Sequence, residues 1–187
     1  MAAHKENAVG IIFKMVSRRE IKEKHEFSVL NSFRRYQKDQ GNLLTISERP
    51  DPPDAIIDIN GKRTWIEISD AFYSQEIAIS VTSYAADDVP HRPSVGGLVD
   101  DPDSTTLCAV VSVIREKLAK QTMKELAKNM GPGILLVGLY GPFFDIDETA
   151  NNLSKEVKNE IAQQNIFGSI YLYENGSSNG HIYKIIK

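Results

Sequence analysis

The chain has 187 residues, of which 41% are hydrophobic and 25% are charged, and its formal net charge is −3. These values are ordinary for a globular protein, and the acidic balance gives no global basic signature of nucleic-acid binding. The single cysteine, Cys108, excludes an intrachain disulfide and a zinc site built from several cysteines.

The length predicts one domain covering residues 1–187. We see neither a signal-peptide pattern nor an apolar run long enough to span a membrane, so we expect a cytoplasmic protein with no membrane partner. Basic residues gather between Lys14 and Arg35, which leaves a local nucleic-acid patch open. No pattern fixes the oligomeric state, and a homodimer is left open.

The first predicted helix covers residues 17–40. Ser17 and Glu20 have the spacing of a capping box, and Gly41 is typical of a helix end. Glu26 lies on the apolar stripe of this helix, where a charged group is unusual. Two interpretations stay open for Glu26: a ligand of a metal site, or a residue at the edge of the stripe. We interpret the neighbouring His25 as a surface histidine.

A first strand is expected at residues 43–46, followed by a hairpin. Two strand-like runs flank Asn60-Gly61, the dipeptide most typical of a two-residue turn. This turn places Asp54 opposite Glu67 near the open end of the hairpin. Like charges that face each other destabilise a sheet, and a divalent cation between them would remove that cost.

Successive side chains of a strand point to opposite faces, so the predicted hairpin has an apolar face and a more polar face. The apolar face, which we expect to meet the core, carries Ala55, Ile57, Ile59, Thr64, Ile66 and Ile68. The more polar face carries Asp54, Ile56, Asp58, Arg63, Trp65, Glu67 and Ser69.

Residues 70–104 read as irregular, either a flap over a substrate or an exposed insertion. Ser104 or Thr105 is expected to cap a long helix over residues 106–130, ended by Gly131. Lys117 lies on the inward stripe of this helix and Lys120 at its edge, and either lysine could instead extend to solvent.

A continuous apolar run at residues 134–140 predicts a strand buried on both faces. A helix over residues 145–164 and a hairpin from 169–173 and 181–186 complete the chain. We interpret His181 and Tyr183 as residues of an edge strand. This order predicts an α/β fold, specifically a single-domain α/β/α sandwich with a mixed central sheet.

The segment Pro-Asp-Pro-Pro-Asp54, the hairpin, and then Trp65-Ile66-Glu67-Ile68-Ser69 resemble the PD-(D/E)XK nuclease superfamily. The resemblance covers about residues 17–140 and implies a restriction-endonuclease-like fold. It implies that Asp54 and Glu67 bind Mg²⁺ or Mn²⁺, with Glu26 and the Ile68 carbonyl as further ligands. The strand lysine of the motif is replaced by Ser69. In branches with Glu-x-Ser/Thr a helix lysine takes that role, which points to Lys117 ahead of Lys120.

The function implied by the resemblance is Mg²⁺-dependent hydrolysis of DNA phosphodiester bonds, with Ser69 bonded to the attacking water or to the lysine. The sequence does not separate DNA from RNA as substrate. A second hypothesis is a non-catalytic nucleic-acid-binding or assembly protein that keeps a degenerate nuclease fold. A metal-independent hydrolase built on Cys108 and His91 finds no supporting family signature.

Overall fold

The computed structural model describes residues 16–94, 101–141, 145–176 and 180–187. Within these ranges the helices and strands follow one another as α1 (Arg18–Asp39), β1 (Leu44–Glu48), β2 (Ala55–Ile59), β3 (Lys62–Phe72), α2 (Gln75–Ala85), α3 (Pro102–Ala119), α4 (Gln121–Met130), β4 (Gly133–Tyr140), α5 (Ile146–Glu156), α6 (Lys158–Gln163), β5 (Phe167–Asn175) and β6 (His181–Ile185).

The strands form one mixed, open sheet whose spatial order is the chain order, β1 to β6. The pairs β1–β2, β2–β3 and β5–β6 are antiparallel, whereas β3–β4 and β4–β5 are parallel. Strand β4 lies inside the sheet and is buried along almost its whole length, as its continuous apolar run predicted. The α/β class with a mixed central sheet is therefore confirmed.

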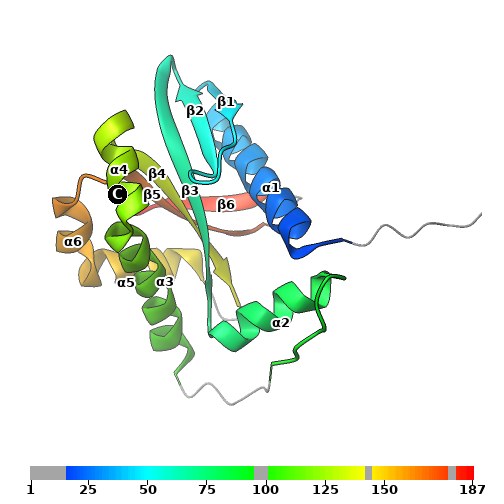
Figure 1. Cartoon of the computed structure of the whole chain (residues 1–187). Helices are drawn as coiled ribbons and strands as arrows, with labels where there is room; N and C mark the ends of the chain where they lie inside the picture. Colours follow the sequence, from blue (N-terminus) through cyan, green and yellow to red (C-terminus); the bar gives the residue numbers. More distant parts are fainter. Residues whose placement is uncertain (1–15, 95–100, 142–144, 177–179) are drawn as a thin grey trace, which may run out of the picture.

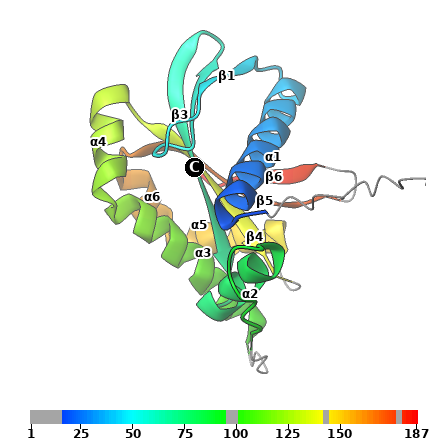
Figure 2. The same cartoon turned by 45° about the vertical axis from the view of Figure 1, so that its right-hand side comes forward.

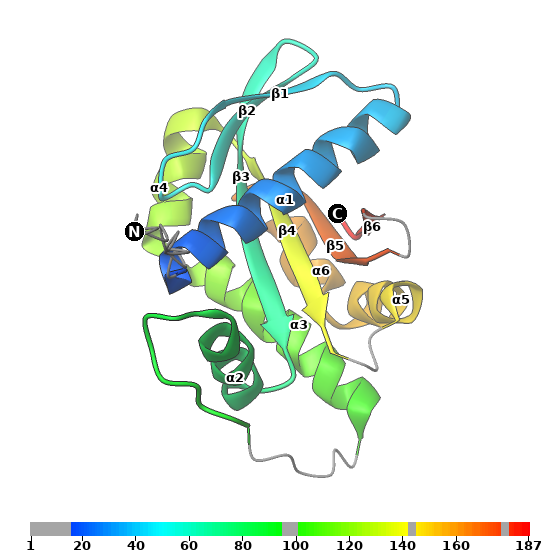
Figure 3. The same cartoon turned by 90° about the vertical axis from the view of Figure 1, so that its right-hand side faces the viewer.

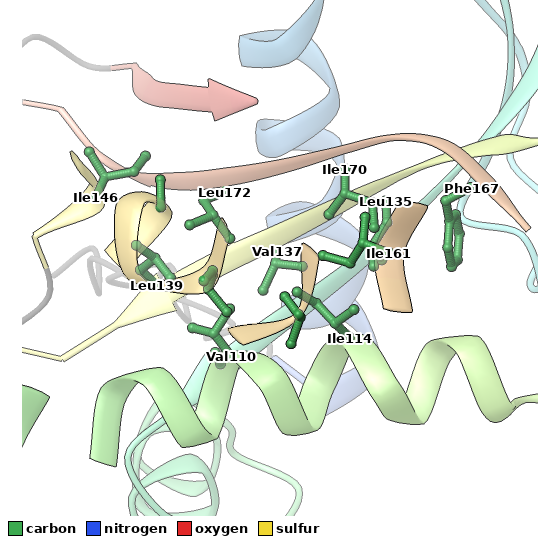
Figure 4. Close-up of a cluster of buried hydrophobic side chains, with 14 of the residues drawn as sticks. Val110, Ile114, Leu135, Val137, Leu139, Ile146, Ile161, Phe167, Ile170 and Leu172 are labelled. Atoms are coloured by element: carbon green, nitrogen blue, oxygen red, sulfur yellow. The ribbon is translucent and has the colours of Figure 1, made fainter. Parts of the chain in front are cut away.

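Helices cover both faces of the sheet (Figures 1 and 3). Helix α1 packs on one face through Val29, Leu30 and Phe33, which join a buried cluster with β2 and β3. Helices α3, α5 and α6 cover the opposite face. Figure 4 shows Val110 and Ile114 of α3 directed toward Val137 of β4 in this second cluster. The sheet thus separates two cores, and α3 and α1 lie on opposite sides of β3.

The hairpin and the first helix form as predicted. Ile59 pairs with Lys62 across the turn, and Asn60 and Gly61 have φ angles of 53° and 82°, the left-handed values that this turn requires. Ser17 makes the capping box with Glu20. The apolar face of the hairpin meets the α1 core, as expected.

The prediction of an irregular segment over residues 70–104 is wrong for much of its length. Strand β3 continues to Phe72 because it pairs in parallel with β4 as far as Tyr140. Helix α2 follows, and the side chain of Ser74 caps it by accepting from the N–H of Ile77. Residues 95–100 of the predicted loop lie outside the described residues. Figure 2 shows α2 below the N-terminal end of α1.

The two long helices predicted in the second half are each divided. Asp101, rather than Ser104 or Thr105, caps α3. The chain leaves helical geometry at Lys120, whose φ and ψ are −66° and 123°, so α3 and α4 are separate elements. Beyond this break, Met123 of α4 is fully buried. The helix predicted over 145–164 divides at Val157 into α5 and α6.

The predicted strand boundaries differ slightly from those observed. The first strand begins at Leu44 and extends to Glu48, and the closing hairpin is formed by β5 and β6. Strand β6 is an edge strand, yet Tyr183 is buried there and its hydroxyl donates to the Val29 carbonyl. In the described part of the chain, no helix combines the length and apolar character needed to cross a membrane.

Candidate active site

Asp54 and Glu67 meet just beyond the point where β2 and β3 stop pairing. The β2–β3 ladder ends at the pair Ala55–Ile66, and each acidic residue is the next one along its chain segment. Asp54 is 6% exposed and Glu67 is 4% exposed. The hairpin face predicted to be more polar is in fact buried here, because Trp65 and Ile56 are buried on it beside the acids.

The backbone of β3 holds Asp54 in place. Its Oδ2 accepts a hydrogen bond of 2.6 Å from the N–H of Ile68. The pKa of Asp54 is raised from 3.8 to about 6, chiefly by burial and also by the charge of Glu26, while the Ile68 N–H and the charges of Lys22 and Lys117 oppose the rise. Asp54 therefore changes charge near neutral pH.

Glu67 is paired with the lysine that sequence reasoning preferred. Lys117 Nζ donates to Glu67 Oε1 at 2.7 Å, and both side chains are largely buried. Helix α3 brings Lys117 there because it lies one turn after Ile114, which packs on the sheet. Burial raises the pKa of Glu67, as does the charge of Asp54, against the hydrogen bond from Lys117. Glu67 Oε2 is buried and has no hydrogen-bond partner among the described residues.

Glu26 faces inward from α1, as its position on the stripe predicted, but it is already neutralised. Its Oε2 accepts from Arg49 Nη2 at 3.0 Å, and its Oε1 lies 3.4 Å from Lys22 Nζ. Glu26 is close enough to Asp54 to influence its pKa. Sequence reasoning missed both cations, although the i,i+4 spacing of Lys22 and Glu26 is a usable signal.

The remaining predicted site residues are placed less directly. Ser69 follows Glu67 by two positions and so shares its face of β3, but its hydroxyl makes no hydrogen bond within the described ranges. Lys120 is exposed at the break after α3, where its charge lowers the pKa of Glu67. Ile68 contributes its N–H to Asp54, and metal binding by its carbonyl stays a prediction.

The donor set fits a hard divalent cation with few protein ligands. No group of three or more histidine, cysteine or acidic side chains suited to a metal occurs in the described residues. Two buried carboxyl groups, one with an unpartnered oxygen, do face the same space. Mg²⁺ is commonly held by one or two carboxylates together with waters and substrate phosphate, so Asp54 and Glu67 suffice in number.

The interpretation of His25 as a surface histidine is wrong. His25 Nε2 lies 3.0 Å from Asp70 Oδ2, and Tyr173 donates to Asp70 Oδ1 at 2.6 Å. The hydroxyl of Tyr140 lies 3.4 Å from His25 Nδ1. The hydrogen bond that the protonated His25 donates to the Asp70 carboxylate raises the pKa of His25 above its usual value, although burial opposes this. Asp70 follows Ile68 by two positions and therefore shares its face of β3. This is the face that packs against α1, opposite the face that carries Glu67.

Comparison with known proteins identifies no relative. No family model, curated protein or solved structure gives a significant match to this chain. The geometry described above is therefore the basis of any functional conclusion.

Proposed function

We propose that this protein is a Mg²⁺-dependent nuclease that hydrolyses DNA phosphodiester bonds and belongs to the PD-(D/E)XK superfamily. One observation carries the proposal: Lys117 of α3 reaches Glu67 at 2.7 Å, beside Asp54, as the resemblance requires once Ser69 replaces the strand lysine. The element order supports it: with α2 and α4 counted as additions, the elements α1, β1, β2, β3, α3 and β4 follow the α-β-β-β-α-β order of the superfamily core.

The acidic pair would hold the cation. Asp54 and Glu67 share buried space in which both pKa values are raised, so bound Mg²⁺ would offset an electrostatic cost that the protein otherwise carries. When bound, the ion would supply Lewis-acid stabilisation of the charge that develops on the phosphate. Glu26 already has two cationic partners, so it would act through its charge or through water rather than as a direct ligand.

The other residues would position the reacting groups. The Ile68 N–H fixes one oxygen of Asp54 and leaves the other for the cation. Lys117 would meet the scissile phosphate or the attacking water, since an ammonium group is a compact charge with three donors. Ser69 shares this face, and its hydroxyl would bond the same water or the lysine.

The experiment is a cleavage assay on linear and supercoiled DNA with Mg²⁺, Mn²⁺ or EDTA. We expect Asp54→Asn, Glu67→Gln and Lys117→Met each to lower the metal-dependent rate by at least about 100-fold, since each removes a charge at the reacting centre. The matched controls are Glu125→Gln and Lys124→Ala on the exposed surface of α4, which should retain the rate. Equal activity in Glu67→Gln and Glu125→Gln would refute the proposed site.

A non-catalytic binding or assembly protein is the second candidate. The observation that favours it is the direct Glu67–Lys117 ion pair, which satisfies part of the acidic site without a metal. Calorimetric titration with Mg²⁺ or Mn²⁺ separates the two candidates. A nuclease should give a binding heat that disappears in the Asp54→Asn variant, and the second candidate should give none.

A further inference from the structure

A cavity lies apart from the acidic pair, between the first turn of α1 and the segment that follows α2. It has a volume of about 370 Å³. Its walls carry two arginines, Arg18 and Arg92, and the apolar side chains of Ile79, Val89 and Pro90. Thr82 and Ser83 of α2 supply two hydroxyl groups. Two guanidinium groups in one small cavity favour an anionic ligand.

Internal hydrogen bonds fix the wall of this cavity. Ser83 Oγ donates to the Ser80 carbonyl at 3.2 Å and accepts from the Arg92 N–H at 3.0 Å, which ties the segment after α2 to the helix. Thr82 Oγ1 donates to the Ala78 carbonyl at 2.8 Å. Because both hydroxyl protons are used within α2, the guanidinium groups are the donors that remain for a ligand.

The residues that line the cavity carry a positive surplus, because they include two arginines and no acidic residue. The guanidinium of Arg92 has no ion-pair partner in the part of the chain that the structure describes. Arg18 Nε lies 3.8 Å from Asp88 Oδ2, beyond hydrogen-bond distance. Asp88 Oδ1 instead accepts from the Arg18 N–H, and Asp87 accepts from the Val16 N–H. Asp87 and Asp88 are thus engaged with backbone amides at and just before the start of α1, and neither lines the cavity.

An exposed aromatic side chain lies beside this surplus. Tyr84 is 80% exposed, and its ring packs edge-on against His91, with centroids 5.4 Å apart. His91 also approaches Ser83 Oγ at 3.4 Å, so this ring pair adjoins the cavity wall. Exposed aromatic faces next to basic side chains are the usual means of holding a nucleobase beside its phosphate.

We propose that this cavity binds the phosphate of a nucleotide, with Arg18 and Arg92 as its ligands and Tyr84 as a face for the base. Arg18, Lys22 and Glu26 are spaced by four residues along α1, so Arg18 at the cavity lies roughly 12 Å along the helix from Glu26. The nucleotide is either free or part of a strand. The strand case rests on the proposed nuclease function, whereas the free-nucleotide case does not.

The test is isothermal titration in EDTA with two probes, AMP and a single-stranded DNA of about ten nucleotides. We expect Arg92→Ala to weaken binding about tenfold or more, as loss of a charge-assisted hydrogen bond does. Asp88→Asn should strengthen binding several-fold, because it removes the carboxylate that competes for Arg18. The control is Arg19→Ala, a neighbouring exposed arginine that pairs with Glu23 and does not line the cavity.

The probes distinguish the two sources of the phosphate. Binding of both probes, lost in Arg92→Ala, supports a site for free nucleotides, and binding of the DNA alone with the same loss supports a strand site. The proposal is overturned if neither probe binds at millimolar concentration, or if Arg92→Ala and Arg19→Ala behave alike. Since the measurement excludes metal, an inactive acidic site would leave its outcome unchanged. Fluorescence of the buried Trp65 verifies that each variant is folded.

Discussion

Replacing Asp54 by asparagine should make the metal-free protein more stable at pH 8. Burial raises the pKa of Asp54 from 3.8 to about 6, so the folded protein resists ionisation of this group. Asparagine keeps an oxygen that can accept from the Ile68 N–H, and it removes the charge. The substitution therefore isolates the cost of the buried charge.

The pH dependence follows from proton linkage. Between pH 3.8 and about 6 the folded state binds the Asp54 proton and the unfolded state does not, so stability falls as pH rises through this window. Below the window the group is protonated in both states and its full contribution is present. At 1.36 kcal/mol for each pH unit, the contribution lost above pH 6 is on the order of 3 kcal/mol.

The assay is urea unfolding in EDTA at pH 4 and pH 8, followed by the fluorescence of Trp65, which is the single tryptophan and is fully buried. We expect Asp54→Asn to gain about 1–3 kcal/mol over the wild type at pH 8 and to gain nothing at pH 4. Added Mg²⁺ should stabilise the wild type and not the variant. The control Glu125→Gln should differ from the wild type by the same small amount at the two pH values.

The reasoning is refuted if Asp54→Asn loses the same free energy of unfolding at pH 4 and pH 8. That result would mean that Asp54 contributes only its hydrogen bond to Ile68, and that its charge is not destabilising in the folded protein.

Three further predictions concern the surroundings of the site. Lys117→Met should destabilise the metal-free protein by about 3 kcal/mol at pH 8 and less at pH 5, measured by urea unfolding, because it leaves Glu67 buried and unpaired; an equal loss at both pH values would contradict this. Asp70→Asn should lower the pKa of His25 in an NMR titration, since the hydrogen bond that Asp70 accepts from His25 raises it, and an unchanged pKa would exclude that cause. Gly138→Ala should lower the free energy of unfolding by about 1–3 kcal/mol in the same urea assay, because the new Cβ would lie 2.5 Å from Asp70 Oδ1. An unchanged free energy of unfolding would show that the Asp70 side chain can move aside.

The elements that local chemistry specifies could be predicted from the sequence. The Asn60-Gly61 turn fixed the register of the hairpin, and the register placed Asp54 beside Glu67. The stripe on α3 placed Lys117 inward because Ile114 lies one turn before it. In both cases a short-range rule determines where the side chain points.

The elements that depend on distant partners could not be predicted. Residues 73–85 show no strong helical period, and α2 forms where β3 ends against β4. The partners of His25 come from β3, β4 and β5, so no spacing within α1 indicates them. Arg49 reaches Glu26 from 23 positions along the chain, beyond the range of any helical rule. Long-range pairing decided each of these features.

The energetics of the acidic pair favour a functional role over a structural one. A buried ion pair such as Glu67–Lys117 can often be replaced by apolar side chains without loss of stability. The hydrogen bond to the Ile68 N–H needs only an acceptor, so asparagine would serve in place of Asp54. Glu26 differs, because Arg49 and Lys22 already neutralise it. Of these three acids, Asp54 has no direct ion-pair partner among the described residues, and Glu67 keeps one oxygen without a hydrogen-bond partner. Ionisable groups kept where burial opposes their charge are typical of sites that bind or react.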